Sequence, residues 1–79
     1  MQLHVKLFAS MVRHVPAAQP GIPFDAEVPD GLTVEALLKR LGLPREEVRV
    51  VFINGRARPM EWVLQPNDKV GIFPAIGGG

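Results

Sequence analysis

Side chains that commonly carry chemistry are scarce in this sequence of 79 residues. It has no cysteine and no tyrosine, and it contains a single serine, Ser10, and a single threonine, Thr33. Without cysteine, the sequence excludes disulfides, thiolate metal sites and cysteine nucleophiles. Ser10 could meet His14 on one helical turn, but no third group is evident to orient the histidine as a base. We therefore interpret Ser10 as a loop serine and His14 as a solvated side chain.

The other ionisable residues do not form a recognisable metal site or acid–base pair. His4 and His14 lie on different expected elements, with no carboxylate at ligand spacing near either of them. Glu46 and Glu47 are adjacent in the chain, so their side chains point apart and are expected to form a solvated face. The sequence therefore predicts no catalytic side chain, no metal site and no bound cofactor.

The glycines at the end of the sequence are the exception. Gly77, Gly78 and Gly79 follow one another, and a glycine run is unfavourable in a packed helix or strand. A strip without side chains can enter a slot that is too narrow for any other residue. Holding it in one conformation costs about 1–2 kcal/mol per residue in entropy, so we expect a flexible tail that becomes ordered only on a partner. A frayed end or an engineered scar is the alternative interpretation.

The reactive group of such a tail is the carboxylate of Gly79. It is ionised at neutral pH, because its ordinary pKa is about 3.3–3.7. A carboxylate is a poor electrophile and must be activated before it reacts, most simply by adenylation with ATP. The activated acyl group can then react with sulfide to give a thiocarboxylate, or with an amine to give an amide. The sequence contains no phosphate-binding loop, so we assign the use of ATP to another protein. The chain itself would then act as substrate and carrier.

Hydrophobic periodicity predicts the elements that carry this tail. Four segments have the pattern of β-strands: residues 2–8, 24–28, 49–53 and 69–73. Asn54 and Gly55 form the strongest short hairpin signal and lead into a short return strand at 56–58. Pro74 is expected to interrupt the last strand, because it has no N–H to donate.

One helix is expected between the second and third strands. Thr33 is a good N-cap, and Gly42 supplies the C-terminal stop. Apolar residues recur at helical spacing to form one stripe: Val34, Leu37, Leu38 and Leu41. The order of elements predicts an α+β domain in two layers, in which a mixed sheet of 4–5 strands packs on one main helix. That order suits a β-grasp arrangement, with residues 1–74 as the domain and residues 75–79 as the flexible glycine tail.

A candidate partner-binding surface lies close to the tail. In the last strand Phe73 should point opposite to Val70 and Ile72, which leaves its ring exposed beside Pro74. We expect Phe8 on the same face of the sheet. The alternative is that a loop covers both rings.

Composition limits the possible partners. The sequence is 47% hydrophobic and has a formal charge of +1, without a cluster of basic residues, so we expect no nucleic acid as partner. No run approaches the roughly 20 apolar residues that span a bilayer, and the first residues do not resemble a signal peptide. We expect a cytoplasmic protein that does not use a membrane.

Over essentially its whole length the sequence resembles the MoaD/ThiS family of ubiquitin-like sulfur carriers. The resemblance rests on Lys6-Leu7-Phe8-Ala9 with Arg13, on Thr33-Val34 with Leu37, and on Asn54-Gly55. Its most specific part is the run Asp68-Lys69-Val70-Gly71-Ile72-Phe73-Pro74-Ala75-Ile76 before the glycines. The Phe-Ala ending of the first strand is more similar to the MoaD branch, the small subunit of molybdopterin synthase. Gly77 departs from the family, which often has another small residue there, and this implies a looser tail.

The resemblance implies a cycle of reactions at Gly79, with Gly78 as the other half of the Gly-Gly signature. An E1-like adenylyltransferase (MoeB/ThiF-like) adenylates the last glycine with ATP, and a sulfurtransferase or cysteine desulfurase system converts it to a thiocarboxylate. An acceptor enzyme, such as the molybdopterin synthase large subunit, then takes the sulfur. Other members feed thiamine thiazole synthesis, tRNA thiolation or other sulfur pathways, and a ubiquitin-like modifier that forms isopeptides remains an alternative.

Overall fold

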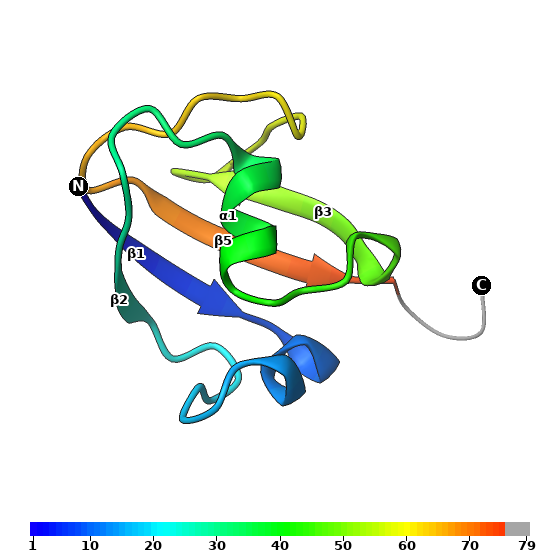
Figure 1. Ribbon diagram of the computed structural model, residues 1–79. Helices are drawn as coiled ribbons and strands as arrows, with labels where there is room; N and C mark the ends of the chain where they lie inside the picture. Colours follow the sequence, from blue (N-terminus) through cyan, green and yellow to red (C-terminus); the bar gives the residue numbers. More distant parts are fainter. Residues whose placement is uncertain (76–79) are drawn as a thin grey trace.

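The computed structural model describes residues 1–75 as a two-layer α+β fold, with the helix α1 lying across one face of a mixed sheet (Figure 1). The sheet has five strands in the order β2-β1-β5-β3-β4. In chain order the elements are β1 (Gln2–Leu7), the 3-10 helix η1 (Ala9–His14), β2 (Phe24–Glu27), α1 (Val34–Arg40), the 3-10 helix η2 (Arg45–Glu47), β3 (Val48–Ile53), β4 (Arg56–Ala57) and β5 (Lys69–Pro74). The neighbours β1 and β5 are parallel, and the other pairs are antiparallel. The predicted α+β class and the central position of the first and last strands are confirmed.

The core lies between α1 and the sheet, and the alternation of the strands builds it. Leu3, Val5 and Leu7 of β1 are fully buried, as the period of two predicts for a strand with one covered face. From α1, Val34, Leu37 and Leu38 meet them in the same cluster. Polar residues of β1 therefore point to the opposite face of the sheet, which α1 does not cover.

Both ends of α1 have the capping chemistry that the sequence predicts. The hydroxyl oxygen of Thr33 accepts a hydrogen bond from the backbone N–H of Ala36 at 3.2 Å. At the other end Gly42 has a φ of +74°, and the N–H of Leu43 donates to the carbonyl of Leu38 at 2.9 Å. These caps fix the length of α1.

The expectation that Pro74 interrupts the last strand is wrong. β5 extends to Pro74, which lies opposite Val48 of β3, and the register shifts between Val48 and Val50. The pairing of β5 with β1 has already ended, at Ile72 opposite Leu7. Proline is tolerated at this strand terminus, where the ladder needs no further donor from it.

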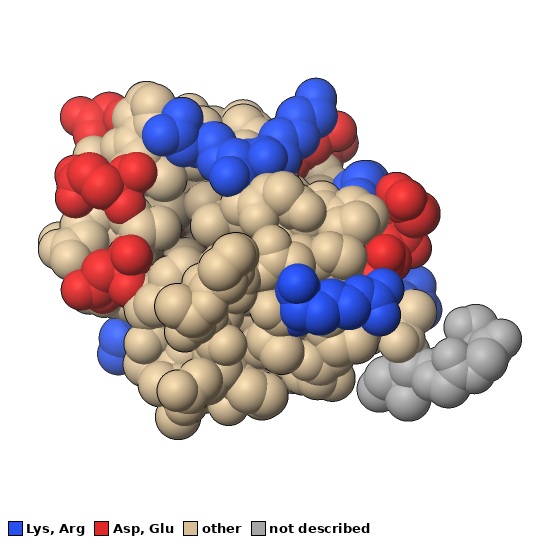
Figure 2. Space-filling model, turned by 60° about the horizontal axis from the view of Figure 1, so that its bottom comes forward, with Lys and Arg blue, Asp and Glu red and all other residues tan. Residues whose placement is uncertain are grey.

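The surface carries charges of both signs. On the face drawn in Figure 2, acidic and basic side chains lie among larger uncharged areas, in part next to one another, and neither sign covers the face. Among residues 1–75, no helix has the length and apolar character that crossing a membrane requires.

Candidate partner-binding site

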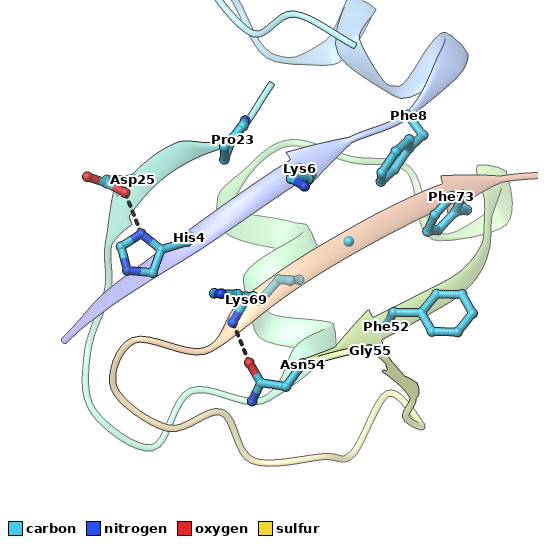
Figure 3. A pocket seen from close by; sticks show the side chains of 12 residues that line it. His4, Lys6, Phe8, Pro23, Asp25, Phe52, Asn54, Gly55, Lys69 and Phe73 are labelled. Atoms are coloured by element: carbon cyan, nitrogen blue, oxygen red, sulfur yellow. Dashed lines mark hydrogen bonds and ion pairs between the residues drawn. The ribbon is translucent and has the colours of Figure 1, made fainter. Parts of the chain in front are cut away.

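The face of the sheet opposite α1 contains an open hollow of about 940 Å³ (Figure 3). In this view α1 lies behind the sheet, and side chains from β1, β3 and β5 point toward the reader. The hollow has an aromatic end and a polar end. Cavities of this size are typical of binding sites.

Three phenylalanines form the aromatic end, and we call Phe8, Phe52 and Phe73 the aromatic cluster. The rings of Phe8 and Phe73 are stacked, with centroids 4.1 Å apart and an angle of 6° between their planes. Phe52 meets Phe73 edge-on, with centroids 5.4 Å apart and an interplanar angle of 79°. The edge-to-face contact of Phe52 with Phe73 is an arrangement that aromatic rings favour.

Strand register explains why these rings meet. Leu7 lies opposite Ile72 in the parallel pair, so the next residue of each strand, Phe8 and Phe73, reaches the same end of the open face. On the other side of β5, Phe52 lies opposite Gly71. A Cβ atom on Gly71 would lie 3.5 Å from a ring carbon of Phe8 and 3.5 Å from one of Phe73. Because Gly71 has no side chain, its backbone lies directly beside the edges of the two rings.

The structure brings Phe8 and Phe73 together, but Pro74 does not join them. Phe8 and Phe73 are half-buried and line the hollow. Pro74 is buried, because it follows Phe73 in the alternation and faces the same side as Ile72. The expectation that Pro74 contributes exposed surface is therefore wrong. The backbone N–H of Gly21 donates to the carbonyl of Leu7, which places the loop before β2 beside Phe8.

The aromatic cluster lies at the end of β5 from which the chain leaves the sheet. Beyond the strand, the backbone N–H of Ala75 donates to the carbonyl of Glu47 in η2 at 3.3 Å. Gly77, Gly78 and Gly79 lie outside the described residues. A partner that contacts the aromatic cluster is thus close to Ala75, the last described residue.

A small charged cluster, which the sequence did not predict, lies beside this exit. One carboxylate oxygen of Glu47 accepts from Arg13 Nη2 at 2.6 Å and from His14 Nε2 at 2.9 Å. The carboxylate only accepts, so His14 donates to it in the tautomer that carries the proton on Nε2; in the other tautomer Nε2 accepts from Arg13 Nε at 3.3 Å. The hydrogen bond from His14, followed by the charge of Arg13, lowers the pKa of Glu47 from its ordinary value of 4.5.

The cluster corrects two interpretations of the sequence. Glu47 is not a freely solvated carboxylate, and His14 contacts Glu47 instead of standing alone in solvent. His14 and Glu47 are 33 residues apart, so local spacing gave no signal for this contact. Elsewhere, His4 Nδ1 lies 2.7 Å from Asp25 across the β1–β2 pair. Within residues 1–75, no three side chains of histidine, aspartate or glutamate gather as metal ligands would.

Together, the sheet order and the single main helix define a ubiquitin-like β-grasp protein with an uncovered sheet face. The sequence model of the ThiS family matches residues 5–79, and the chain belongs to this family of small ubiquitin-like carriers and modifiers. No curated protein sequence matches it significantly.

Solved structures from archaea have the same fold. SAMP1 from Haloferax volcanii is 20% identical, with a TM-score of 0.73 and full coverage of both chains. A proposed molybdopterin converting factor subunit 1 from Pyrococcus furiosus is 23% identical, with a TM-score of 0.72 over 96% of this chain and 99% of that one. The Haloferax volcanii protein HVO 2177 is 28% identical, with a TM-score of 0.76 over 100% of this chain and 87% of that one.

Proposed function

We propose that the protein is a sulfur carrier whose working group is the carboxylate of Gly79. An E1-like adenylyltransferase transfers AMP from ATP to this carboxylate and releases pyrophosphate. A persulfide of a sulfurtransferase or cysteine desulfurase system then attacks the acyl group and releases AMP, and a thiol reduces the S–S bond of the resulting acyl disulfide, which leaves a thiocarboxylate on Gly79. The chain supplies the acyl group and no catalytic side chain.

The match of the ThiS family through residue 79 carries this proposal, because the match includes the terminal glycines. The location of the aromatic cluster supports it. An enzyme that acts on a strip of glycines gains little contact from the strip itself and must hold the body of the carrier. The open sheet face offers apolar area for this purpose, close to the exit of the chain.

We further propose molybdopterin synthesis as the pathway, with the molybdopterin synthase large subunit as the acceptor enzyme. Its basis is the MoaD-like sequence around Phe8 and the likeness in fold to the Pyrococcus furiosus protein. Carriers for thiamine thiazole synthesis or tRNA thiolation would have the same tail chemistry. Adding each acceptor enzyme in turn to the thiocarboxylated protein, and measuring which one consumes it, would separate these pathways.

Intact-mass measurement of the protein purified from its native cells tests the carrier function. We expect a fraction whose mass is higher by the difference between sulfur and oxygen, and we expect that fraction to disappear in a variant that lacks Gly78 and Gly79. A protein that never carries the added sulfur, even in cells with an active sulfur pathway, would contradict the proposal.

Protein modification is the second candidate, because the chain shares its fold with small archaeal modifier protein 1 of Haloferax volcanii. In this case the activated Gly79 would form an amide with a lysine of a target protein. The same mass measurement distinguishes the two candidates, since conjugates are larger by a whole target protein. A third possibility is an interaction domain that does not use its tail, and it predicts unchanged activity after deletion of Gly78 and Gly79.

A further inference from the structure

A second hollow, of about 510 Å³, lies at the β3 edge of the sheet, next to α1. Three arginines from different elements line it: Arg45 of η2, Arg49 of β3 and Arg58, which follows β4. The strand β4 pairs only with Phe52 and Ile53, so the hollow lies where β3 extends beyond its short neighbour. We call it the arginine hollow.

The three guanidinium groups of the arginine hollow have unused donors. None of them forms an ion pair within residues 1–75, where all five ion pairs involve other groups. Arg45 Nη1 donates to the carbonyl of Val48 at 3.5 Å, which is long for a hydrogen bond. The Nε of Arg58 is buried and has no acceptor among the described residues, and a buried donor without an acceptor is uncommon in proteins.

Contacts within the chain hold Arg58 in place without using its side-chain donors. Its Cζ atom lies 4.0 Å from the centroid of the Trp62 ring, which is a cation–π contact. The stack occupies a face of the planar guanidinium, whereas the N–H donors lie in its plane. The backbone N–H of Arg58 donates to the carbonyl of Val51 at 3.0 Å. A ligand therefore meets a group that is already ordered, which reduces the entropic cost of binding.

The other lining residues limit the kind of anion that fits. Glu35 of α1 and Glu61 are exposed, line the same hollow and form no ion pair with the arginines. Their charges disfavour an extended polyanion such as a nucleic acid, whereas a small anion needs room only beside the arginines. Pro59 and Met60 add apolar surface to the wall.

We propose that the arginine hollow binds the phosphate group of a small organic molecule. The phosphate oxygens face Arg45, Arg49 and Arg58, and the organic part of the ligand lies against Pro59 and Met60. The oxygens of a phosphate group point in tetrahedral directions and can accept from several guanidinium groups at once, whereas a carboxylate offers two oxygens in one plane. The inference uses neither the aromatic cluster nor Gly79, so it does not depend on the sulfur-carrier function.

Titration with phenyl phosphate and with inorganic phosphate, at constant ionic strength and near neutral pH, tests the ligand class. Amide NMR shifts report the binding. We expect saturable shifts around the arginine hollow, with a Kd of about 1 mM or below for phenyl phosphate. Inorganic phosphate should bind more weakly, because it has no apolar part to bury on Pro59 and Met60. Equal affinities would contradict an organic ligand, and shifts that do not saturate with either probe would overturn the site.

Neutral variants test the arginines. Arg45→Gln and Arg49→Gln should each raise the Kd about tenfold, since each removes hydrogen bonds to a charged group. Both side chains are exposed and form no ion pair among the described residues, so the variants should fold, and thermal unfolding checks this. The matched control is Arg56→Gln, which removes the same charge from an exposed residue of β4 outside the hollow. If the control weakens binding equally, the effect comes from net charge, and the inference is wrong.

Removing a carboxylate should have the opposite sign. Glu61→Gln should lower the Kd about twofold, because the lost charge repels the phosphate; a higher Kd would contradict the arrangement. A single-stranded oligonucleotide that binds at the same residues more tightly than phenyl phosphate would make nucleic acid the ligand and overturn the proposal. These outcomes leave the mass measurement at Gly79 untouched, so failure of the phosphate site and failure of the carrier function are distinguishable.

Discussion

Asp68 is a buried carboxylate whose role the structure explains by hydrogen bonds. It is 8% exposed, and its two oxygens accept from Asn54 Nδ2 and from the backbone N–H of Gln65, both at 2.8 Å. The side-chain oxygen of Asn54 in turn accepts from the backbone N–H of Lys69 at 2.9 Å. The network attaches the start of β5 to the tip of the β3–β4 hairpin. Asp68, the first residue of the run 68–76 that resembles the family, thus has a structural role.

Replacing Asp68 should destabilise the fold. Asp68→Ala leaves the amide of Asn54 and the N–H of Gln65 without their acceptor, which should lower the free energy of unfolding by about 2 kcal/mol. Urea denaturation of both proteins measures this difference. The control is Glu46→Ala, because Glu46 is exposed and forms no side-chain hydrogen bond with residues 1–75. Equal stability of the Asp68→Ala protein and the unaltered protein would contradict the structural role.

Among the elements, η1 and η2 are joined by the cluster of Arg13, His14 and Glu47. These two short 3-10 helices are far apart in sequence and border the site where β5 ends. The carboxylate of Glu47 contacts Arg13 and His14 of η1, and the backbone carbonyl of Glu47 accepts a hydrogen bond from the N–H of Ala75. The cluster therefore holds the exit of the chain against the body of the domain.

This link should make stability depend on pH. The folded state lowers the pKa of Glu47 below 4.5, so the unfolded chain binds the proton more tightly than the folded one. The contribution of Glu47 is present above pH 4.5 and is lost as the pH falls through the lower folded value. Chemical denaturation from pH 7 to pH 3 should show Glu47→Gln less stable than the unaltered protein at pH 7, with the difference shrinking in acid. Glu46→Gln serves as the control, and a difference for Glu47→Gln that stays constant with pH would contradict this link.

The fold as a whole depends on pairing between the first and last strands, β1 and β5, which are neighbours in the sheet. The buried core residues lie between Leu3 and Ile72, and β5 contributes Val70 and Ile72 from the middle of the sheet. The described contact beyond β5 is the single backbone hydrogen bond from Ala75. We therefore propose residues 1–74 as the folding unit, as the sequence predicts.

Two truncations test this boundary. Deleting residues 75–79 removes none of the core residues found within residues 1–75, and we expect a loss of about 1 kcal/mol, the value of one hydrogen bond. Deleting residues 70–79 removes a central strand, and we expect no cooperative unfolding transition. Circular dichroism during thermal unfolding measures both. If the protein that lacks residues 75–79 also has no cooperative unfolding transition, the tail belongs to the folding unit.

Local patterns were sufficient for the strands and for α1, but they did not predict η2. The alternation in β1 and the stripe of α1 correctly predicted the buried residues Leu3, Val5 and Leu37. The opposite orientation of Phe73 and Ile72 also follows from the period of two. The proline at position 74 was misjudged, because a strand terminus tolerates the missing N–H where a strand interior does not.

Local patterns in the sequence were enough to predict the α+β class and the main helix α1. The side chains from distant strands that share a site could be identified from the folded structure alone, not from local patterns. Period and propensity specify the face of a strand, but the register between β1 and β5 is set by packing of the core. That register places Lys6 beside Gly71 and Phe8 on Phe73, and the folding of η2 against η1 brings Glu47 to Arg13.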